Sequence, residues 1–469
     1  TLSTVSTKKP RLGTNICKTL VVISIETTTV FLAMATDTYP SWFNRATFYP
    51  PDPIFALTAR FIADPDPNKV NLGQGTYRDD GGKPWILSSV HQAREKLISQ
   101  KLYHEYLPIL GLAEFRSRAA EVALGTRIYR EHRERLATCQ SLSGTGSLHL
   151  TGLLLRAVLN PLPKVFIPEP TWSNHHQIFR ALGFECQSFP YYDYANKTLD
   201  FDSYISTLES AEPHSIFILH ACAHNPTGCD PSKSQWEQIG QIFKDRQLFP
   251  LFDAAYLGFN SGDVDKDAFA IRYFVDDLKL ETAVCMSFAK NMGLYGERVG
   301  CTVLVAKKSS TARNAESMLE MLQRSEVSNP PAFGARIAST VLGDDQLKKA
   351  WYEDMVTMSG RIRSMRTQLH ALLVSQGNFM WNLLSQSSKA EQQLTNKETP
   401  GSWDHLVNQT GMFGFLGLSP NVVKQLRGRS DQYYIYMSAN SRISLAGLNS
   451  HNVEYVARSI KTCLEDQQF

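Results

Sequence analysis

The sequence has few cysteines and lacks the glycine-rich motifs of nucleotide-binding proteins. There are 8 cysteines in 469 residues and no Cys-x-x-Cys pair, which excludes a disulfide framework and the usual zinc-site spacing. We therefore expect no metal and a reducing compartment. No Gly-x-Gly-x-x-Gly segment follows an early strand, and no Gly-Lys-Ser/Thr follows a glycine-rich turn. These absences argue against a nucleotide-binding dehydrogenase and against a P-loop enzyme.

An excess of one charge is also missing. The formal net charge is +3, and residues 1–33 alone carry four basic residues against one acidic residue, so the rest of the chain is formally neutral. A neutral chain offers no broad basic surface for nucleic acid or for an anionic membrane, and we expect neither as a partner. An anionic substrate would have to be bound by a few well-placed cations.

No long apolar run is present. The most apolar N-terminal stretch, residues 21–35, is interrupted by Glu26 and three threonines, and it is too short and too polar to span a bilayer. Residues 1–40 are predicted to be an N-terminal extension that is disordered or serves targeting. The lack of acidic residues before Glu26 is typical of a mitochondrial transit peptide. We favour an extension upstream of Met34, and hence a cytoplasmic location.

Short apolar runs alternate with helical patterns between about residues 86 and 343. This alternation predicts an α/β fold with a largely parallel sheet. The candidate strands are Lys164–Pro168, Ser215–Ala221, Leu248–Asp253, Thr282–Ser287 and Val299–Ala306. The candidate helices are Ser89–Gln100, Leu112–Tyr129, Ser147–Leu159, Ser234–Asp245 and Pro331–Leu342.

The pattern changes after Gly343. A long helix is predicted over Asp345–Gln376 and a final helix over Asn452–Asp466. We therefore predict a large domain over residues 86–343 and a small domain over residues 344–469. Residues 41–85 are predicted to be an irregular N-terminal arm that forms part of the small domain. The polar residues 377–397 are predicted to be an inserted surface loop.

Lys290 directly follows an apolar strand, in a segment interrupted by glycines. The strand ends of open α/β sheets are where ligands bind, and a lysine held there can form a Schiff base with an aldehyde. Arg298, eight residues later, could bind a phosphate through two hydrogen bonds. Taken alone, however, a loop lysine is most often only a surface residue.

Asp253 ends another apolar strand, three residues before Tyr256. A buried carboxylate needs a partner, and a protonated pyridine nitrogen is one such partner. The negative charge would keep that nitrogen protonated, so that the ring could withdraw electrons. By itself, Asp253 would more simply be a helix cap or a metal ligand.

Two turns complete the set. Ser143-Gly144-Thr145-Gly146 opens a helix, where exposed N–H groups suit a phosphate. Asn225 begins an Asn-Pro-Thr-Gly turn after a strand, and its amide could donate to a ring oxygen, although an ordinary turn is the simpler interpretation. Each signal is weak alone, and their order along the chain is what makes them informative.

In that order, the set resembles the aspartate aminotransferase family of fold-type I pyridoxal-phosphate enzymes, from about Ser41 to the C-terminus. Residues 64–73 and 104–109, which read DPDPNKVNLG and HEYLPI, are most similar to the eukaryotic cytosolic form. The resemblance implies a large domain with a mostly parallel seven-stranded sheet flanked by helices, and a smaller α+β domain. It also implies reversible transfer of the amino group from L-aspartate to 2-oxoglutarate in two half-reactions.

The resemblance assigns roles around pyridoxal 5′-phosphate. Lys290 would form the internal aldimine and then move the proton between substrate and cofactor. Asp253 would pair with the ring nitrogen and be supported by His175, while Tyr256 and Asn225 would bond the ring oxygen. The phosphate would be held by hydroxyl, backbone and guanidinium groups, namely Ser143, Gly144, Thr145, Ser287, Arg298 and, from a partner subunit, Tyr106.

The resemblance also implies how the substrate is bound. Arg442 would bind the α-carboxylate, and Arg324 of a partner subunit would bind the side-chain carboxylate. Trp172 would stack on the cofactor ring and, with Gly75 and Asn225, line the substrate site. Sites shared in this way imply a homodimer that acts on dicarboxylic amino acids and 2-oxo acids.

Several residues depart from the family pattern. Residues 324–329 read RSEVSN where the family usually has RITWSN, and Glu326 could neutralise or displace the arginine two residues before it. Residues 73–75 read GQG in place of GVG, and Ala289 and Met292 replace the commoner Ser and Phe beside the lysine. These departures leave open an aminotransferase of aromatic or broad specificity. They also leave open a weakly active homologue kept for binding, although the intact set of motif residues argues against it.

Overall fold

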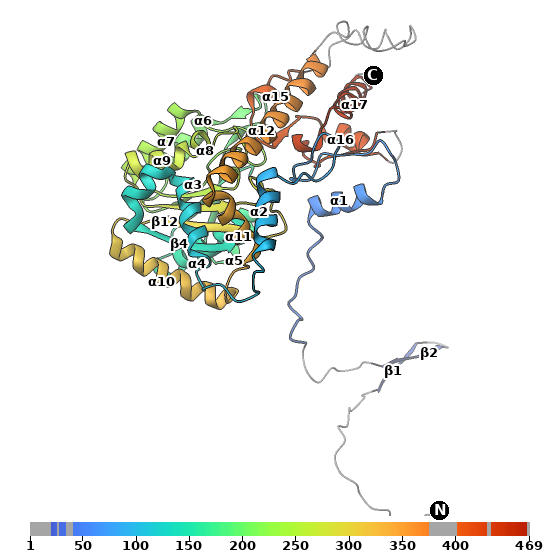
Figure 1. Cartoon of the computed structure of the whole chain (residues 1–469). Helices are drawn as coiled ribbons and strands as arrows, with labels where there is room; N and C mark the ends of the chain where they lie inside the picture. The colour runs from blue at the N-terminus through green and yellow to red at the C-terminus, as the bar shows by residue number, and fades with distance from the viewer. Residues whose placement is uncertain (1–19, 26–27, 34–40, 375–400, 429–432, 467–469) are drawn as a thin grey trace, which may run out of the picture. The chain divides into compact units, whose positions relative to one another are not determined.

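The computed structural model describes residues 20–25, 28–33, 41–374, 401–428 and 433–466. The predicted insertion 377–397 and most of the predicted extension 1–40 lie outside these ranges. The chain divides into two compact units, Thr1–Asp52 and Pro53–Phe469 (Figure 1). In the first unit, β1 (Leu20–Ile25) pairs antiparallel with β2 (Thr28–Ala33). All the functional groups considered below belong to the second unit.

A seven-stranded sheet forms the centre of the second unit. In spatial order, its strands are β4 (Leu136–Leu142), β12 (Val299–Val305), β11 (Thr282–Ser287), β10 (Phe249–Ala254), β9 (Ile216–His220), β5 (Val165–Glu169) and β6 (Cys186–Pro190). Neighbouring strands are parallel except at β12, which is antiparallel to both β11 and β4. The predicted α/β fold with a mostly parallel seven-stranded sheet is confirmed.

All five predicted strands are present, with ends that agree to about one residue. Strands β4 and β6 were not predicted, because their sequences, LATCQSL and CQSFP, are not apolar runs. In β4 the polar side chains of Gln140 and Ser141 are buried. The backbone carbonyl of Gln140 accepts from the side-chain amide of Gln323 at 2.7 Å. The side-chain amide of Gln140 donates to the Pro331 carbonyl at 2.7 Å. These bonds allow a polar strand to lie inside the protein.

Helices cover both faces of the sheet. They are α3 (Ala113–His132), α4 (Ser143–Val158), α5 (Asn174–Ala181), α6 (Phe201–Ser210), α7 (Lys233–Arg246), α10 (Ser309–Glu326) and α11 (Phe333–Gly343). Helix α2 (Ser88–Ser99) packs outside them, on α11 and α12 (Asp345–Val374). The strands bury alternate residues on opposite faces, as a strand buried on both sides requires. In β9, Ile216 and Ile218 join the core beneath α4, whereas Phe217 and Leu219 join the larger core on the other face.

The second unit also contains further elements. They are α1 (Pro53–Ala63), β3 (Val70–Asn71), η1 (Arg133–Arg135), β7 (Tyr192–Asp193), β8 (Thr198–Leu199), α8 (Val264–Asp267), α9 (Phe269–Arg272), η2 (Tyr273–Asp277), α12 (Asp345–Val374), α15 (His405–Asn408), β13 (Phe413–Phe415), α16 (Pro420–Leu426), β14 (Ile435–Tyr436), β15 (Arg442–Ser444), η3 (Leu445–Gly447) and α17 (Val453–Glu465). Strand β3 pairs with β14, which brings residues 70–71 beside the C-terminal part of the chain. The division into a large and a small domain at residue 343 stays a prediction, since residues 53–469 form one compact unit.

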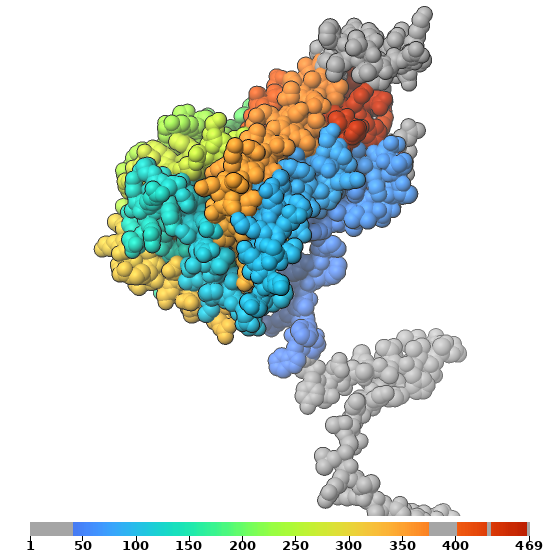
Figure 2. All heavy atoms as spheres, in the orientation of Figure 1, coloured from blue at the N-terminus to red at the C-terminus, as the bar shows by residue number. Residues whose placement is uncertain are grey.

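The 30-residue helix α12 packs beside α2, and Figure 2 shows the two side by side on the molecular surface. Asp354 of α12 is buried and accepts hydrogen bonds from the backbone N–H of Ser89 at 3.1 Å and from its hydroxyl at 2.6 Å. The Asp354 carboxylate therefore caps the first turn of α2, because the N-terminal end of a helix favours a negative charge. Within the described ranges, no helix has the length and apolar character needed to cross a membrane.

Candidate active site

The predicted cofactor-binding residues converge on one edge of the sheet. Asp253 lies near the carboxyl end of β10, Ser287 ends β11, and Ser143 directly follows β4. Because β12 runs antiparallel to its neighbours, it begins at this same edge and places Arg298 there. The carboxyl edge of a parallel sheet is where open α/β proteins bind ligands.

Ser143, Ser287 and Arg298 form a turn suited to a phosphate. Ser143 is the first residue of α4, and its hydroxyl lies 2.8 Å from that of Ser287. Its backbone N–H donates to the Arg298 carbonyl at 3.1 Å. The Arg298 guanidinium is exposed and donates from Nη1 to the Tyr295 carbonyl at 2.9 Å. N–H groups at a helix N-terminus, hydroxyls and a guanidinium are the kinds of donor that suit a dianionic phosphate.

The backbone of this turn is strained. Ser143 has φ +60° and Arg298 has φ +54°, both in the left-handed region that non-glycine residues rarely adopt. A Cβ at Gly144 would lie 3.3 Å from the Cβ of Ser287, so the turn has room for little more than glycine there. Strain of this kind costs about 1–3 kcal/mol per residue and is concentrated at functional sites.

Asp253 is buried and bonded to His175. The Nε2 of His175 donates to the Oδ2 of Asp253 at 2.9 Å. Burial alone would raise the pKa of Asp253, but the hydrogen bond from His175 and the nearby charge of Lys290 bring this pKa below its usual value. The carboxylate is therefore held in its charged form, ready to face a positive group.

Behind Asp253 runs a chain of hydrogen bonds that the sequence analysis did not foresee. Burial lowers the pKa of His220 well below its usual value, so its ring is neutral and has one donor and one acceptor nitrogen. Its Nδ1 accepts from the Asn225 N–H at 3.4 Å, and its Nε2 donates to the Thr171 hydroxyl at 3.1 Å. Thr171 in turn donates to the Nδ1 of His175 at 2.8 Å. Asn225 and Asp253 are thus linked through three side chains.

The Lys290 amine lies 5.3 Å above the centre of the Tyr256 ring. Burial lowers the pKa of this amine, against the opposing charge of Asp253, and Arg298 lowers it further. A lower pKa increases the neutral fraction of the amine, which is the nucleophilic form. Burial raises the pKa of Tyr256 well above its usual value, so its hydroxyl stays a donor.

Trp172 lies beside the same cluster. Its half-buried ring meets that of His175 edge-on, with the centroids 5.4 Å apart and the planes at 90°. Thr145, also half-buried, is in the first turn of α4, after Ser143 and Gly144. Trp172 and Thr145 thus follow the carboxyl ends of β5 and β4, and their predicted contacts with the cofactor stay predictions.

Arg442 is fixed from two directions. It begins β15, its Nη2 donates to the Gly73 carbonyl at 2.6 Å, and its guanidinium lies 4.6 Å from the centre of the Phe413 ring. A Cβ at Gly75 would lie 2.7 Å from the Cζ of Phe413, so this close approach requires glycine. The charge of Arg442 also acts on the Tyr256 phenol, where it opposes the rise in pKa. Phe413, which the sequence analysis missed, therefore supports the predicted substrate arginine.

Tyr106 and Arg324 are on the surface of their own chain. Tyr106 is 86% exposed, and the exposed Arg324 donates from Nη1 to the Ser328 hydroxyl. The segments that carry them are joined, because the Asn329 amide donates to the Leu107 carbonyl at 3.1 Å. These two residues form a surface feature that is separate from the Lys290 cluster, as expected for groups that serve a neighbouring subunit.

The cluster fits a bound pyridoxal phosphate. It offers an anion site at a helix N-terminus, a charged carboxylate for a pyridinium nitrogen, phenol and amide groups for a ring oxygen, an indole, and a lysine with a lowered pKa. These are the groups that such a cofactor needs around its phosphate, ring and aldehyde.

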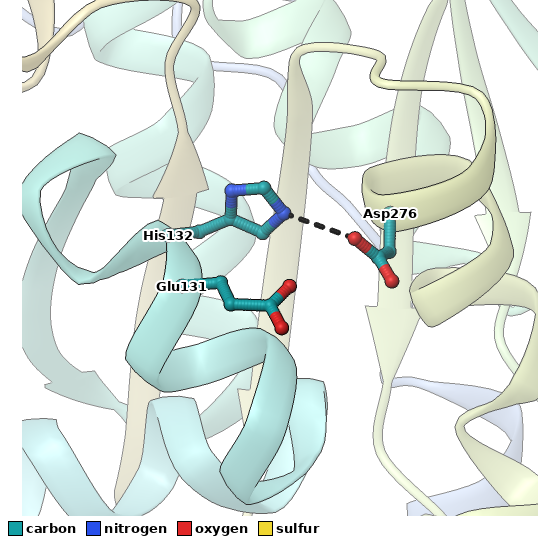
Figure 3. Close-up of side chains that lie close together, drawn as sticks. All are labelled: Glu131, His132 and Asp276. Atoms are coloured by element: carbon teal, nitrogen blue, oxygen red, sulfur yellow. Dashed lines mark hydrogen bonds and ion pairs between the residues drawn. The ribbon is translucent and has the colours of Figure 1, made fainter.

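A second cluster, Glu131, His132 and Asp276, has the composition of a metal site (Figure 3). Its central carboxylate is already occupied, because Asp276 pairs with Arg127, with Lys279 at 2.9 Å and with His132 at 3.3 Å. Hydrogen bonds from Lys279 and Arg127 hold the pKa of Asp276 far below its usual value. Cations thus take the place that a metal ion would need, and we interpret the cluster as a structural ion-pair network.

We expect Asp276→Asn to lower the free energy of unfolding at pH 7 by about 1–2 kcal/mol, because the cations lose their partner. A carboxyl pKa that is depressed by folding stabilises the protein above the unfolded pKa of about 3.9 and loses that effect as the pH falls. The difference in the free energy of unfolding between wild type and Asp276→Asn should therefore shrink as the pH falls below about 4. Thermal unfolding of the holoenzymes across this range measures it, with Glu131→Gln as the control. A zinc-dependent rise in the wild-type Tm that Asp276→Asn removes would contradict the ion-pair interpretation.

Comparison with known proteins agrees with the geometry. The family described as aminotransferase class I and II matches residues 67–460. The cytoplasmic aspartate aminotransferase of Saccharomyces cerevisiae is 43% identical over 425 residues, which cover 89% of this chain and 96% of the relative. The mitochondrial aspartate aminotransferase of Schizosaccharomyces pombe is 44% identical over 411 residues, 88% of each chain.

A solved structure extends the comparison. The aromatic-amino-acid aminotransferase of Burkholderia pseudomallei, covalently bound to pyridoxal phosphate, matches with a TM-score of 0.82 at 35% identity, covering 91% of this chain and 100% of the other. With the lysine, aspartate and phosphate turn gathered at one edge of the sheet, the chain belongs to the class I and II aminotransferases, whose cofactor is pyridoxal phosphate.

Proposed function

We propose that the protein is an aspartate aminotransferase, which transfers the amino group of L-aspartate to 2-oxoglutarate and gives oxaloacetate and L-glutamate. The observation that carries the proposal is the fixed guanidinium of Arg442 in the same site as the Lys290–Tyr256 pair. A fixed guanidinium binds a carboxylate through two parallel hydrogen bonds. The two yeast relatives, both aspartate aminotransferases, support the choice of substrate.

In this proposal each residue near the ring has one task. Pyridoxal phosphate, when bound, supplies an electron sink that acidifies the proton on the substrate α-carbon. Lys290 moves that proton between the α-carbon and the C4′ carbon of the cofactor, which its lowered pKa favours. Asp253 keeps the ring nitrogen protonated, Tyr256 and Asn225 donate to the ring oxygen, and Trp172 stacks on the ring.

The groups at the phosphate turn position the cofactor. Ser143, Ser287 and Arg298 bind the phosphate together with the N–H groups of Gly144 and Thr145. Because these groups are fixed before binding, little ordering is needed when the phosphate enters.

Substrate specificity and assembly are linked. Arg442 binds the α-carboxylate, and Arg324 of the partner subunit binds the side-chain carboxylate, while Tyr106 of the partner subunit reaches the phosphate. The exposure of Tyr106 and Arg324, and the bond between their segments, support a homodimer with shared sites. Tyr106 also lines a groove of about 800 Å³ together with Ile98 and Phe333, whose apolar surfaces a second copy would cover.

For its location we propose the cytoplasm, as expected from the sequence. The two yeast relatives comprise one cytoplasmic and one mitochondrial enzyme. A mitochondrial location is the alternative if residues 1–33 act as a transit peptide.

The visible spectrum of the purified holoenzyme tests the function. We expect the band of the lysine-bound cofactor to disappear on addition of L-aspartate and to return with 2-oxoglutarate, because the two half-reactions are reversible. L-Phenylalanine should act at least about tenfold more slowly, since it lacks the carboxylate that Arg324 binds. A band that ignores L-aspartate but responds to L-phenylalanine would favour the aromatic or broad specificity that the changed residues around Arg324 suggest. No band after addition of pyridoxal phosphate would leave only a non-catalytic homologue.

A further inference from the structure

We propose that His149 is a positioning residue for substrate specificity, because it holds the Glu326 carboxylate away from Arg324. This inference rests on the proposed function and explains how an arginine can bind a carboxylate with an acidic residue two positions away. The contact that carries it joins the Nε2 of His149 to the Oε2 of Glu326 at 3.1 Å.

The end of α10 separates the two charges. Arg324 and Glu326 lie in the last turn of this helix, where residues two apart do not face each other. The chain then leaves the helix at Val327, with φ −137° and ψ 2°. Ser328 has φ +68° and turns back so that its hydroxyl accepts from the Arg324 guanidinium. Arg324 thus has a neutral partner, which leaves its charge for a substrate.

Glu326 points instead to the neighbouring helix. His149 lies in α4, which packs against α10. The side chains of His149 and Glu326 are 36% and 41% exposed, so each keeps part of its contact with water. A histidine can donate Nε2–H to a carboxylate whether or not it is protonated, so the bond does not require a charged ring.

Loss of the His149–Glu326 bond would weaken substrate binding rather than destabilise the fold. A released Glu326 carboxylate could pair with Arg324 or repel the side-chain carboxylate that Arg324 is proposed to bind. Between groups at a partly exposed site, such an interaction changes a binding constant by about three- to tenfold. A substrate without a side-chain carboxylate would not be affected.

The experiment compares half-reactions of L-aspartate and L-phenylalanine in the holoenzyme by stopped-flow absorption. We expect His149→Ala to raise the KM for L-aspartate about fivefold, with the rate at saturation and the L-phenylalanine reaction unchanged. His149→Arg, which keeps a donor to Glu326, should retain the wild-type KM. In the double variant His149→Ala/Glu326→Gln the KM should return to near the wild-type value, because no carboxylate is left to release.

Arg324→Asp is measured in parallel as the reference. If it weakens L-aspartate selectively but His149→Ala does not, or if the double variant fails to recover, the role of His149 is overturned and the proposed function stands. If Arg324→Asp weakens both substrates equally, Arg324 does not bind the side-chain carboxylate, and the specificity proposal and the role of His149 fall together.

Discussion

Replacement of Lys290 by alanine is expected to lower the rate of both half-reactions by about 10⁴-fold or more, while the protein keeps its fold. In the proposed function, Lys290 supplies the amine that bonds the cofactor and moves the substrate proton, and loss of either role would lower the rate by several orders of magnitude. Lys290 is only partly buried, so thermal unfolding should change by only a few degrees. The rate is measured by stopped-flow absorption with L-aspartate, and the fold by circular dichroism.

A lysine outside the site provides the control. Lys266 is exposed and lies 3.8 Å from Asp263, and Lys266→Ala should keep full activity. A Lys290→Ala protein that still bonds pyridoxal phosphate covalently and transfers amino groups would remove Lys290 from its proposed place, and with it the whole site.

We expect Asp253→Asn to reduce kcat by about 10³-fold, the second largest effect. The amide keeps the shape of the carboxylate and can still accept from His175, but it carries no charge to hold the ring nitrogen in its protonated form. The ring would then withdraw electrons weakly when the α-carbon loses its proton. The measurement is kcat for L-aspartate together with the absorption of the bound cofactor.

Asp265→Asn removes an exposed carboxylate that pairs with Arg272 at 2.8 Å, and it serves as the matched control. Activity of Asp253→Asn within tenfold of wild type would mean that the charge is not needed. In that case the bond to His175 would be a structural contact only.

The strands that the sequence analysis found are those whose apolar residues are consecutive. Both faces of β9, β10 and β11 are buried, and such strands read as continuous apolar runs. Strand β4 was not predicted because its buried polar residue Gln140 is bonded to Gln323 and Pro331, which are distant in sequence. Partners of this kind cannot be read from a single segment.

The same limit applies to the site. Lys290 and Asp253 stand out because they lie at or just after the end of a predicted apolar strand, and Ser143 stands out because it opens a glycine-rich turn at the start of a helix. Thr171 and Phe413 do not stand out, because they act on His175 and Arg442 through contacts that only the folded chain creates. The sequence suggested that Glu326 could neutralise or displace Arg324. In the structure Glu326 instead bonds His149, which is 177 residues away in the sequence.

The reversed direction of β12 also bears on the entropy of cofactor binding. Antiparallel pairing of Ser287 with Gly300 closes residues 288–298 into a loop anchored at both ends, and this loop carries both Lys290 and Arg298. The entropy of closing a loop grows with its length, and here the sheet closes it as the protein folds. The sheet therefore holds Lys290 and Arg298 in one short loop anchored at both ends, so little chain entropy of this loop would be left to lose if the two residues bind the cofactor as proposed.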